Sequence, residues 1–127
     1  MHCCVHRSKD IAVPKEQEPA AEQQVQEAVI RNVKSMVGVV RMHNPQAVIA
    51  LSSFYHFDRP DYINKLNEEY RLLAQEQKLV FIDVAGELPY EREMVYDYGH
   101  FTAEGDRRAA KVFSAALLPV IGRLPAL

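Results

Sequence analysis

The sequence lacks a long apolar run, and this absence bears first on membranes. None of its apolar stretches approaches the roughly 20 residues that are needed to cross a bilayer. The first ten residues also lack the apolar stretch of a secretory signal. We therefore expect a soluble chain with no membrane span and no signal peptide in the sequence as given, while its compartment stays unknown.

An excess of charge of one sign is also lacking. The 17 acidic and 15 basic residues are scattered along the 127 residues and give a net charge of −2. No basic stripe could neutralise a run of phosphates, and no glycine-rich phosphate loop occurs. A nucleic-acid partner is therefore not expected.

Cysteine is scarce, which excludes a disulfide framework. The only two, Cys3 and Cys4, are adjacent, and adjacent side chains in a strand point to opposite faces. With His2 and His6 they place four potential zinc ligands close together, but structural zinc sites use separated ligand pairs. We predict no metal and no other cofactor, and we interpret this segment as the end of a strand.

What the sequence does contain is an alternation of helical and strand-like segments. Residues 11–21 hold two prolines and several charges and form a predicted linker. Beyond it we predict a helix over 22–42, a strand over 47–51, a helix over 62–77, a strand over 79–84 and, after a long loop, a helix capped by Thr102. The valines at positions 25, 29, 33, 37 and 40 share one face of the first helix.

Apolar strands that alternate with helices indicate the α/β class, with a parallel sheet covered on both faces. Two strands bury too little surface alone, so we expect a third, either around residues 3–6 or from sequence beyond that given. The predicted organisation is an N-terminal strand remnant and linker over 1–21, followed by the C-terminal part of a single domain over 22–127. This domain is an incomplete doubly wound one that lacks its N-terminal strands.

The pattern with most chemical content is Asp-x-x-His in the loop before the last helix. A turn that contains Gly99 lets the Asp97 carboxylate fold back onto Nδ1–H of His100, which fixes the tautomer and leaves Nε2 free as a base. Such a pair is half of a catalytic triad. The alternative is that Asp97 only stabilises a turn and that His100 is a surface histidine.

The residues that follow make the pattern more specific. After His100 come Phe101, Thr102 and, two residues later, Gly105. This block resembles the last sequence block of the SGNH/GDSL hydrolases, and the similarity runs from about residue 22 to residue 121.

The resemblance implies a flavodoxin-like, three-layer α/β sandwich of the SGNH type. It also implies hydrolysis of esters of acyl groups, lipids or acetylated sugars by a Ser-Asp-His triad without a metal. Carried over to this chain, His100 is the general base and Asp97 is its orienting partner.

The Gly-Asp-Ser block that carries the nucleophile of that family is absent from this sequence. Ser52 and Ser53 follow a predicted strand and are conceivable replacements, although serines at such positions commonly satisfy backbone groups. Lys9 stands where a side-chain oxyanion donor is expected from a distant match to the Gly-x-Asn-Asp block, and its alternative is a solvated lysine. His56 lies in an aromatic loop that either lines a substrate pocket or covers the end of the core.

Two hypotheses follow from these residues. The first is a truncated SGNH/GDSL-like ester hydrolase domain that acts on a small-molecule, glycan or lipid ester and is nearly inactive alone, because losing a nucleophile removes covalent catalysis. The second is a non-catalytic binding or interaction module on a degenerate scaffold of the same kind. An incomplete sheet exposes an open edge and apolar surface, so self-association through it is expected in that case.

Overall fold

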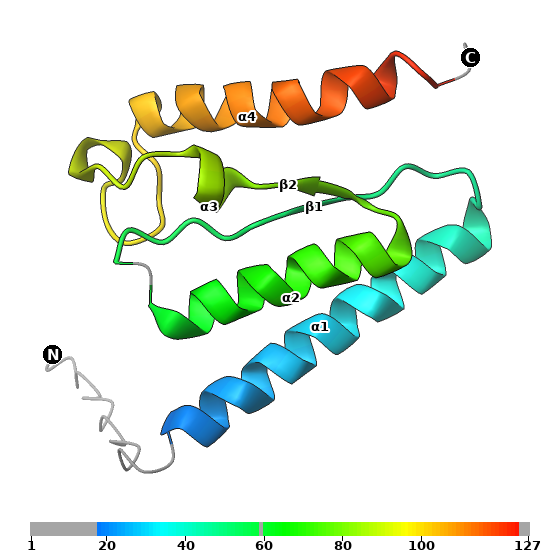
Figure 1. Ribbon diagram of the computed structural model, residues 1–127, viewed down its shortest axis with the longest axis horizontal. Coiled ribbons are helices and arrows are strands. Elements are labelled where there is room, and N and C mark those ends of the chain that lie inside the picture. Colours follow the sequence, from blue (N-terminus) through cyan, green and yellow to red (C-terminus); the bar gives the residue numbers. More distant parts are fainter. Residues whose placement is uncertain (1–17, 59, 125–127) are drawn as a thin grey trace, which may run out of the picture.

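The computed structural model describes residues 18–58 and 60–124 and shows a small sheet between helices (Figure 1). The elements are, in chain order, α1 (Glu18–His43), β1 (Ala50–Ser52), α2 (Asp61–Gln77), β2 (Val80–Ile82), α3 (Val84–Glu87), the 3-10 helix η1 (Arg92–Met94) and α4 (Ala103–Ile121). The protein is therefore mixed α/β, and most of the described elements are helical.

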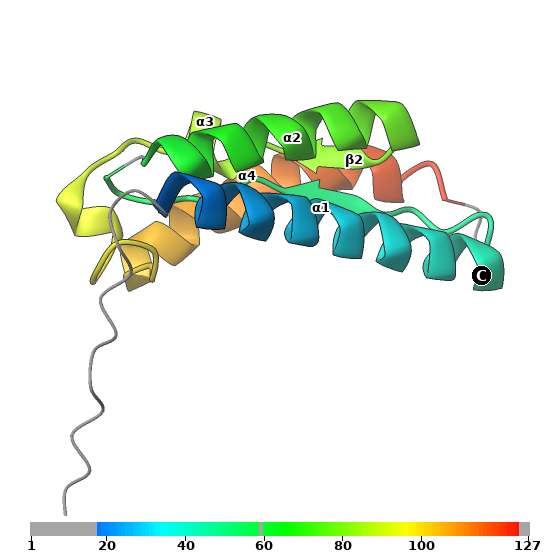
Figure 2. The same cartoon turned by 90° about the horizontal axis from the view of Figure 1, so that it is seen from below.

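The sheet consists of β1 and β2, which pair in parallel with Ala50 opposite Val80 and Ser52 opposite Ile82. Helices α1 and α2 cover one face of it, and α4 covers the other (Figure 1). The view in Figure 2 shows α1 and α2 running alongside each other. The predicted parallel sheet with helices on both faces is thus confirmed. The described residues form no third strand, and residues 3–6 lie outside them.

The two faces of the sheet bury separate apolar clusters. Successive strand residues point to opposite faces, so Phe81 packs toward α1 and α2 whereas Ile82 packs toward α4. The cluster under α1 and α2 contains Val33, Val37, Leu66, Tyr70 and Leu73. The cluster under α4 contains Tyr55, Ile82, Val84, Leu88, Met94, Val95 and Ala109. Met94 and Val95, which lead into the Asp-x-x-His loop, are therefore anchored in the core.

Helix α1 is longer than predicted and buries less of its apolar face. It begins at Glu18, before the predicted start at residue 22, so the linker is shorter than expected. Proline at position 19 is tolerated there because first-turn amides have no intrahelical acceptor. Of the five valines, Val33 and Val37 are buried, but Val25 is 62% exposed and Val40 is 40% exposed. Only the middle of α1 therefore packs against the core.

The strands are shorter than predicted, and the long loop after β2 is partly helical. Asp83, which was assigned to the second strand, instead caps α3, and its Oδ1 accepts a hydrogen bond of 3.0 Å from the Gly86 amide. Aspartate is among the residues preferred at a helix N-cap, where its carboxylate accepts a bond from an amide of the first turn. Neither α3 nor η1 was predicted.

The last helix begins where the sequence predicts. Thr102 is its N-cap, and its Oγ1 accepts a hydrogen bond of 3.2 Å from the Gly105 amide. The same hydroxyl donates to the Glu93 carbonyl at 2.7 Å, which joins the start of α4 to η1. The two ends of the Asp-x-x-His loop are held together in this way.

Candidate active site

Residues 95–101 form a closed loop between η1 and α4. Val95 and Phe101 form an isolated antiparallel bridge at its base. The Tyr96 amide donates to the His100 carbonyl at 2.8 Å, and the Thr102 amide donates to the Met94 carbonyl at 3.0 Å. The loop is therefore closed by its own backbone, with its base on the core and its tip in solvent.

Asp97 and His100 form the predicted pair at the tip of this loop. Oδ2 of Asp97 lies 2.7 Å from Nδ1 of His100. Oδ1 of Asp97 accepts hydrogen bonds of 2.9 Å from the amides of Gly99 and His100. Both carboxylate oxygens are thus used within the loop, and the carboxylate is oriented by the backbone as well as by the histidine.

This environment fixes the charge of Asp97. The backbone hydrogen bonds from Gly99 and His100, followed by the one from the His100 ring, hold the pKa of the Asp97 carboxyl well below its usual range. A charged carboxylate accepts the Nδ1 proton, so the His100 tautomer assigned from this bond leaves Nε2 as an acceptor. The His100 side chain is 86% exposed, so Nε2 is open to solvent and to a substrate.

The segment after β1 lies against the tip of the loop. The Phe57 amide donates to the Tyr98 carbonyl at 2.7 Å. The His56 ring stacks on the Tyr98 ring, with centroids 5.5 Å apart and planes at 10°. Nδ1 of His56 is buried without a hydrogen-bond partner. His56 therefore supports the loop through Tyr98, and in the described residues it makes no hydrogen bond to Asp97 or His100.

Tyr55 belongs to the core. It is 8% exposed, its hydroxyl donates to the Pro89 carbonyl at 2.8 Å, and its ring packs against Tyr90 and Phe101. Burial, more than the nearby acidic groups, raises the pKa of this phenol. This part of the aromatic loop covers the end of the core.

The structure pairs neither candidate serine with His100 in the described residues. Ser53 is buried, and its hydroxyl donates to Oδ1 of Asp83 at 3.2 Å and accepts from the Ala85 amide at 2.8 Å. Such a hydroxyl satisfies backbone and side-chain groups where β1 and β2 end. Ser52 lies within β1, opposite Ile82. No hydrogen bond joins either serine to His100 in the described part of the chain, and Lys9 lies outside it.

Sequence reasoning missed Arg92, whose guanidinium donates to the carbonyls of Tyr96 at 3.1 Å and Asp97 at 3.2 Å. The acceptors of Arg92 are backbone groups, which leave no trace in a residue pattern.

Sequence reasoning also gave no role to Asn67 of α2. Its buried side-chain amide bonds to both backbone groups of Phe54, at 2.7 and 2.8 Å, and fixes the chain after β1.

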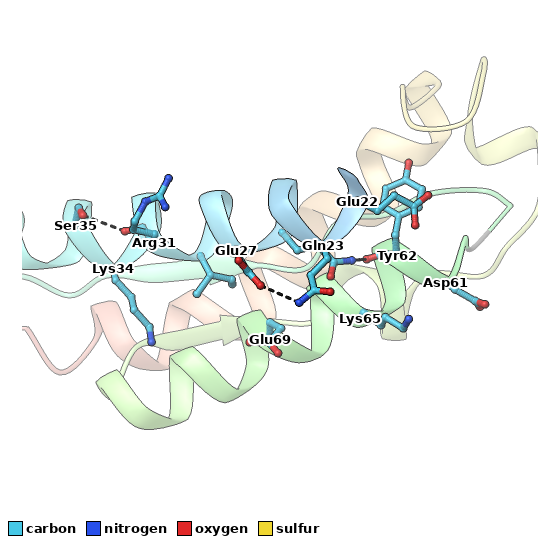
Figure 3. A pocket seen from close by; sticks show the side chains of 12 residues that line it. Glu22, Gln23, Glu27, Arg31, Lys34, Ser35, Asp61, Tyr62, Lys65 and Glu69 are labelled. Carbon is cyan, nitrogen blue, oxygen red and sulfur yellow. Dashed lines mark hydrogen bonds between the residues drawn. The ribbon is translucent and has the colours of Figure 1, made fainter. Parts of the chain in front are cut away.

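The structure also contains a pocket that is separate from the Asp97–His100 pair. Its volume is about 920 Å³, and it lies between the N-terminal parts of α1 and α2 (Figure 3). These two helices lie on the face of the sheet opposite α4 (Figure 1). Gln26 donates a hydrogen bond across this groove to the Tyr62 carbonyl at 2.8 Å, and both acidic and basic side chains line the walls, among them Glu27 and Lys34 in Figure 3. The pocket does not include Asp97 or His100, and its mixed charges do not select one ligand class.

The comparisons with known proteins gave no relative. No protein-family model, no curated protein and no solved structure matched the chain. Within residues 18–58 and 60–124, no cluster of three or more potential ligands is close enough to hold a metal ion. None of the helices in these ranges has the length and apolar character that crossing a membrane requires.

Proposed function

We propose that this chain carries the Asp–His half of an SGNH/GDSL-like ester hydrolase site, on a partial flavodoxin-like sandwich of the SGNH type. The observation that supports it best is the 2.7 Å contact between Asp97 and Nδ1 of His100, with the carboxylate fixed by two backbone amides. A carboxylate that only stabilised a turn would not need to orient an imidazole whose other nitrogen faces solvent. The substrate class is an acyl or acetyl ester of a small molecule, glycan or lipid.

In this mechanism His100 moves a proton twice. Nε2 takes the proton of the attacking hydroxyl as its oxygen bonds to the ester carbonyl carbon, and it returns that proton to the leaving alcohol as the carbon–oxygen bond breaks. Asp97 holds the tautomer and stabilises the imidazolium between the two steps. A base of this kind typically contributes 10²–10⁴-fold in rate.

The attacking hydroxyl is not assigned to a described residue. Ser53 is committed to Asp83 and Ala85, and Ser35 donates to the Arg31 carbonyl. Ser52, in β1, makes no hydrogen bond to His100 in the described part of the chain, so we assign the attack to water or to a hydroxyl that the described residues do not bond to His100. With water alone the expected turnover is low, because covalent catalysis is missing.

Hydrolysis of p-nitrophenyl acetate tests the proposal. This activated ester reports the reactivity of individual imidazoles, so we expect His100→Ala to remove most of the histidine-dependent hydrolysis. His43→Ala is the matched control, because His43 is an exposed histidine at the far end of α1. Asp97→Asn should also lower the rate, since a neutral amide no longer selects the Nδ1–H tautomer.

Equal losses in the His100→Ala and His43→Ala variants would contradict the proposal, because His100 would then react as any surface histidine does. An unactivated acetyl ester in the same series measures turnover rather than imidazole reactivity. Labelling with a fluorophosphonate probe, followed by mass spectrometry, would locate a nucleophilic serine and would test Ser52 and Ser53 directly.

A second candidate function is an interaction module that pairs with another copy of this chain. The observation that favours it is the apolar surface of α1, where Met36 is 59% exposed, Val39 is 54% exposed and Met42 is 73% exposed. Large exposed apolar side chains that gather on one element are typical of interaction surfaces. The mass of the protein in solution tests this function.

A further inference from the structure

We propose that Arg92 is a positioning residue that holds the tip of the Asp97–His100 loop to η1 and to the segment after β1. Its Nη2 donates to the Tyr96 carbonyl at 3.1 Å and its Nη1 donates to the Asp97 carbonyl at 3.2 Å. The carbonyls of Tyr96 and of Asp97 itself are thus held by one planar guanidinium group.

The loop tip needs such a support because it has little packing of its own. Residues 96–100 are all exposed, whereas Met94 and Val95 at the base are buried. An orienting carboxylate works only if its own backbone is fixed, because a small displacement of the base lowers the rate. The Asp97 side chain is fixed by the amides of Gly99 and His100, and its carbonyl is fixed by Arg92.

Phe57 links the same guanidinium to a second element. The Arg92 guanidinium carbon lies 5.6 Å from the centroid of the Phe57 ring, and the Phe57 amide donates to the Tyr98 carbonyl. Arg92 therefore lies between the loop that carries the dyad and the segment that follows β1. Cation–π contact and hydrogen bonding use different parts of a guanidinium, so both are made at once.

The contacts of Arg92 are of a kind that a structural ion pair does not explain. Arg107 and Arg108 on α4 pair with Glu104, but no salt bridge joins Arg92 to a carboxylate in the described residues. Its two donors go to carbonyls instead. Lysine cannot reproduce this arrangement, because it lacks both the fork of donors and the planar face.

The catalytic meaning of this inference rests on the proposed function, but the geometry can be tested without any ester. The experiment compares the wild-type protein with Arg92→Ala and Arg92→Lys by NMR. Nitrogen-15 shifts of the His100 ring report its tautomer, and amide hydrogen exchange reports the bonds from Gly99 and His100 to Asp97. Arg31→Ala in α1 is the matched control, because Arg31 lines the pocket between α1 and α2, on the face of the sheet opposite α4.

In Arg92→Ala we expect exchange at the Gly99 and His100 amides to become about 3- to 10-fold faster, as the loss of hydrogen bonds predicts. The His100 ring should shift toward a mixture of tautomers, while the amides of α4 keep their wild-type rates. Arg92→Lys should resemble Arg92→Ala, because a positive charge without the planar set of N–H donors does not hold both carbonyls.

Three results would overturn the inference, whether or not the protein hydrolyses esters. The first is unchanged exchange and an unchanged tautomer in Arg92→Ala. The second is wild-type behaviour of Arg92→Lys, which would reduce the role of Arg92 to its charge. The third is equal acceleration across α4, which would make Arg92 a general stabilising residue. If Arg92→Ala does not fold, the Lys variant alone decides.

Discussion

Asp97 shows how a short loop can set the chemistry of a single residue. Its carboxylate accepts two backbone hydrogen bonds and one from an imidazole, although more than half of the side chain is exposed. Backbone amides cannot lose their protons, so this part of its environment is independent of pH. The group that orients His100 is therefore charged at every pH above its lowered pKa.

A titration of Asp97 by NMR should show this directly. We expect a carboxyl pKa well below the ordinary value of 3.8. Because folding lowers this pKa, the contribution of Asp97 to stability is present above the ordinary pKa and is lost as the pH falls toward the folded-state pKa. In His100→Ala both backbone donors remain, so the pKa should rise only in part and stay below 3.8.

A midpoint near 3.8 in the wild-type protein would show that the loop is open in solution.

At this scale the sequence predicted the pair but not its support. The spacing from Asp97 to His100 was enough, because a turn with a glycine closes on itself through local bonds. The alternative given for Ser53, that its hydroxyl satisfies a backbone group, is confirmed, but its partners and the role of Arg92 were not predictable. Each depends on groups brought together by the fold, Asp83 for the serine and two carbonyls for the arginine.

Among the elements, the start of α4 approaches its neighbours very closely. A Cβ on Gly105 would overlap the Met94 carbonyl oxygen and would lie 2.9 Å from the Phe101 ring. The same carbonyl accepts the Thr102 amide, so the helix start, η1 and the base of the loop meet at one point. The glycine is needed for this close approach.

Gly105→Ala should therefore destabilise the protein by about 1–3 kcal/mol, the usual cost of overpacking a rigid site. Gly38→Ala in α1 is the matched control, because nothing lies within 4 Å of its added Cβ. That change should stabilise α1 by about 0.5–1 kcal/mol, since alanine loses less backbone entropy in a helix. Urea unfolding followed by circular dichroism measures both. A Gly105→Ala protein as stable as the wild type would exclude this tight contact.

Helices were predicted better than strands, for a physical reason. The 3.6-residue period of α2 and α4 and the Thr102 cap are local signals, and both helices lie where they were predicted. Strand ends depend on the partner strand. Ala47 to Ile49 are apolar but β1 begins at Ala50, and Asp83 leaves β2 to cap α3. The extra turns of α1 and the exposure of Val25 depend on what covers the helix, which no local pattern records.

At the scale of the whole molecule, the helices cover the sheet unevenly. Helix α4 packs over β2, whereas Ala50 in β1 is exposed. On the other face, helical spacing puts Val29, Met36 and Val40 on the flank of α1 that turns away from α2, and the last two are exposed. An open strand next to exposed apolar helices leaves room for further layers of an α/β domain.

If the interaction module is the correct function, a second copy of this chain covers this surface. Light scattering after size exclusion should then give the mass of a dimer, and Met36→Lys should shift it to the 14.5 kDa monomer. A lysine buried in the interface loses its hydration without gaining a partner of opposite charge, and this destabilises the dimer. Leu72→Lys on α2, where the leucine is 51% exposed, is the matched control and should leave the dimer intact. A monomer in the wild-type protein would rule this function out.

The closed base of the Asp-x-x-His loop has a consequence for how this protein can change over evolutionary time. Met94, Val95, Thr102 and Gly105 are tied to the core or to one another, so replacing any of them disturbs the helix start as well as the loop. Residues 96–100 at the tip are exposed and are not anchored in the core, so the fold allows them to diverge as surface loops do. Across relatives, a tip that kept its aspartate and histidine while its neighbours drifted would therefore record selection for the chemistry and not for the fold.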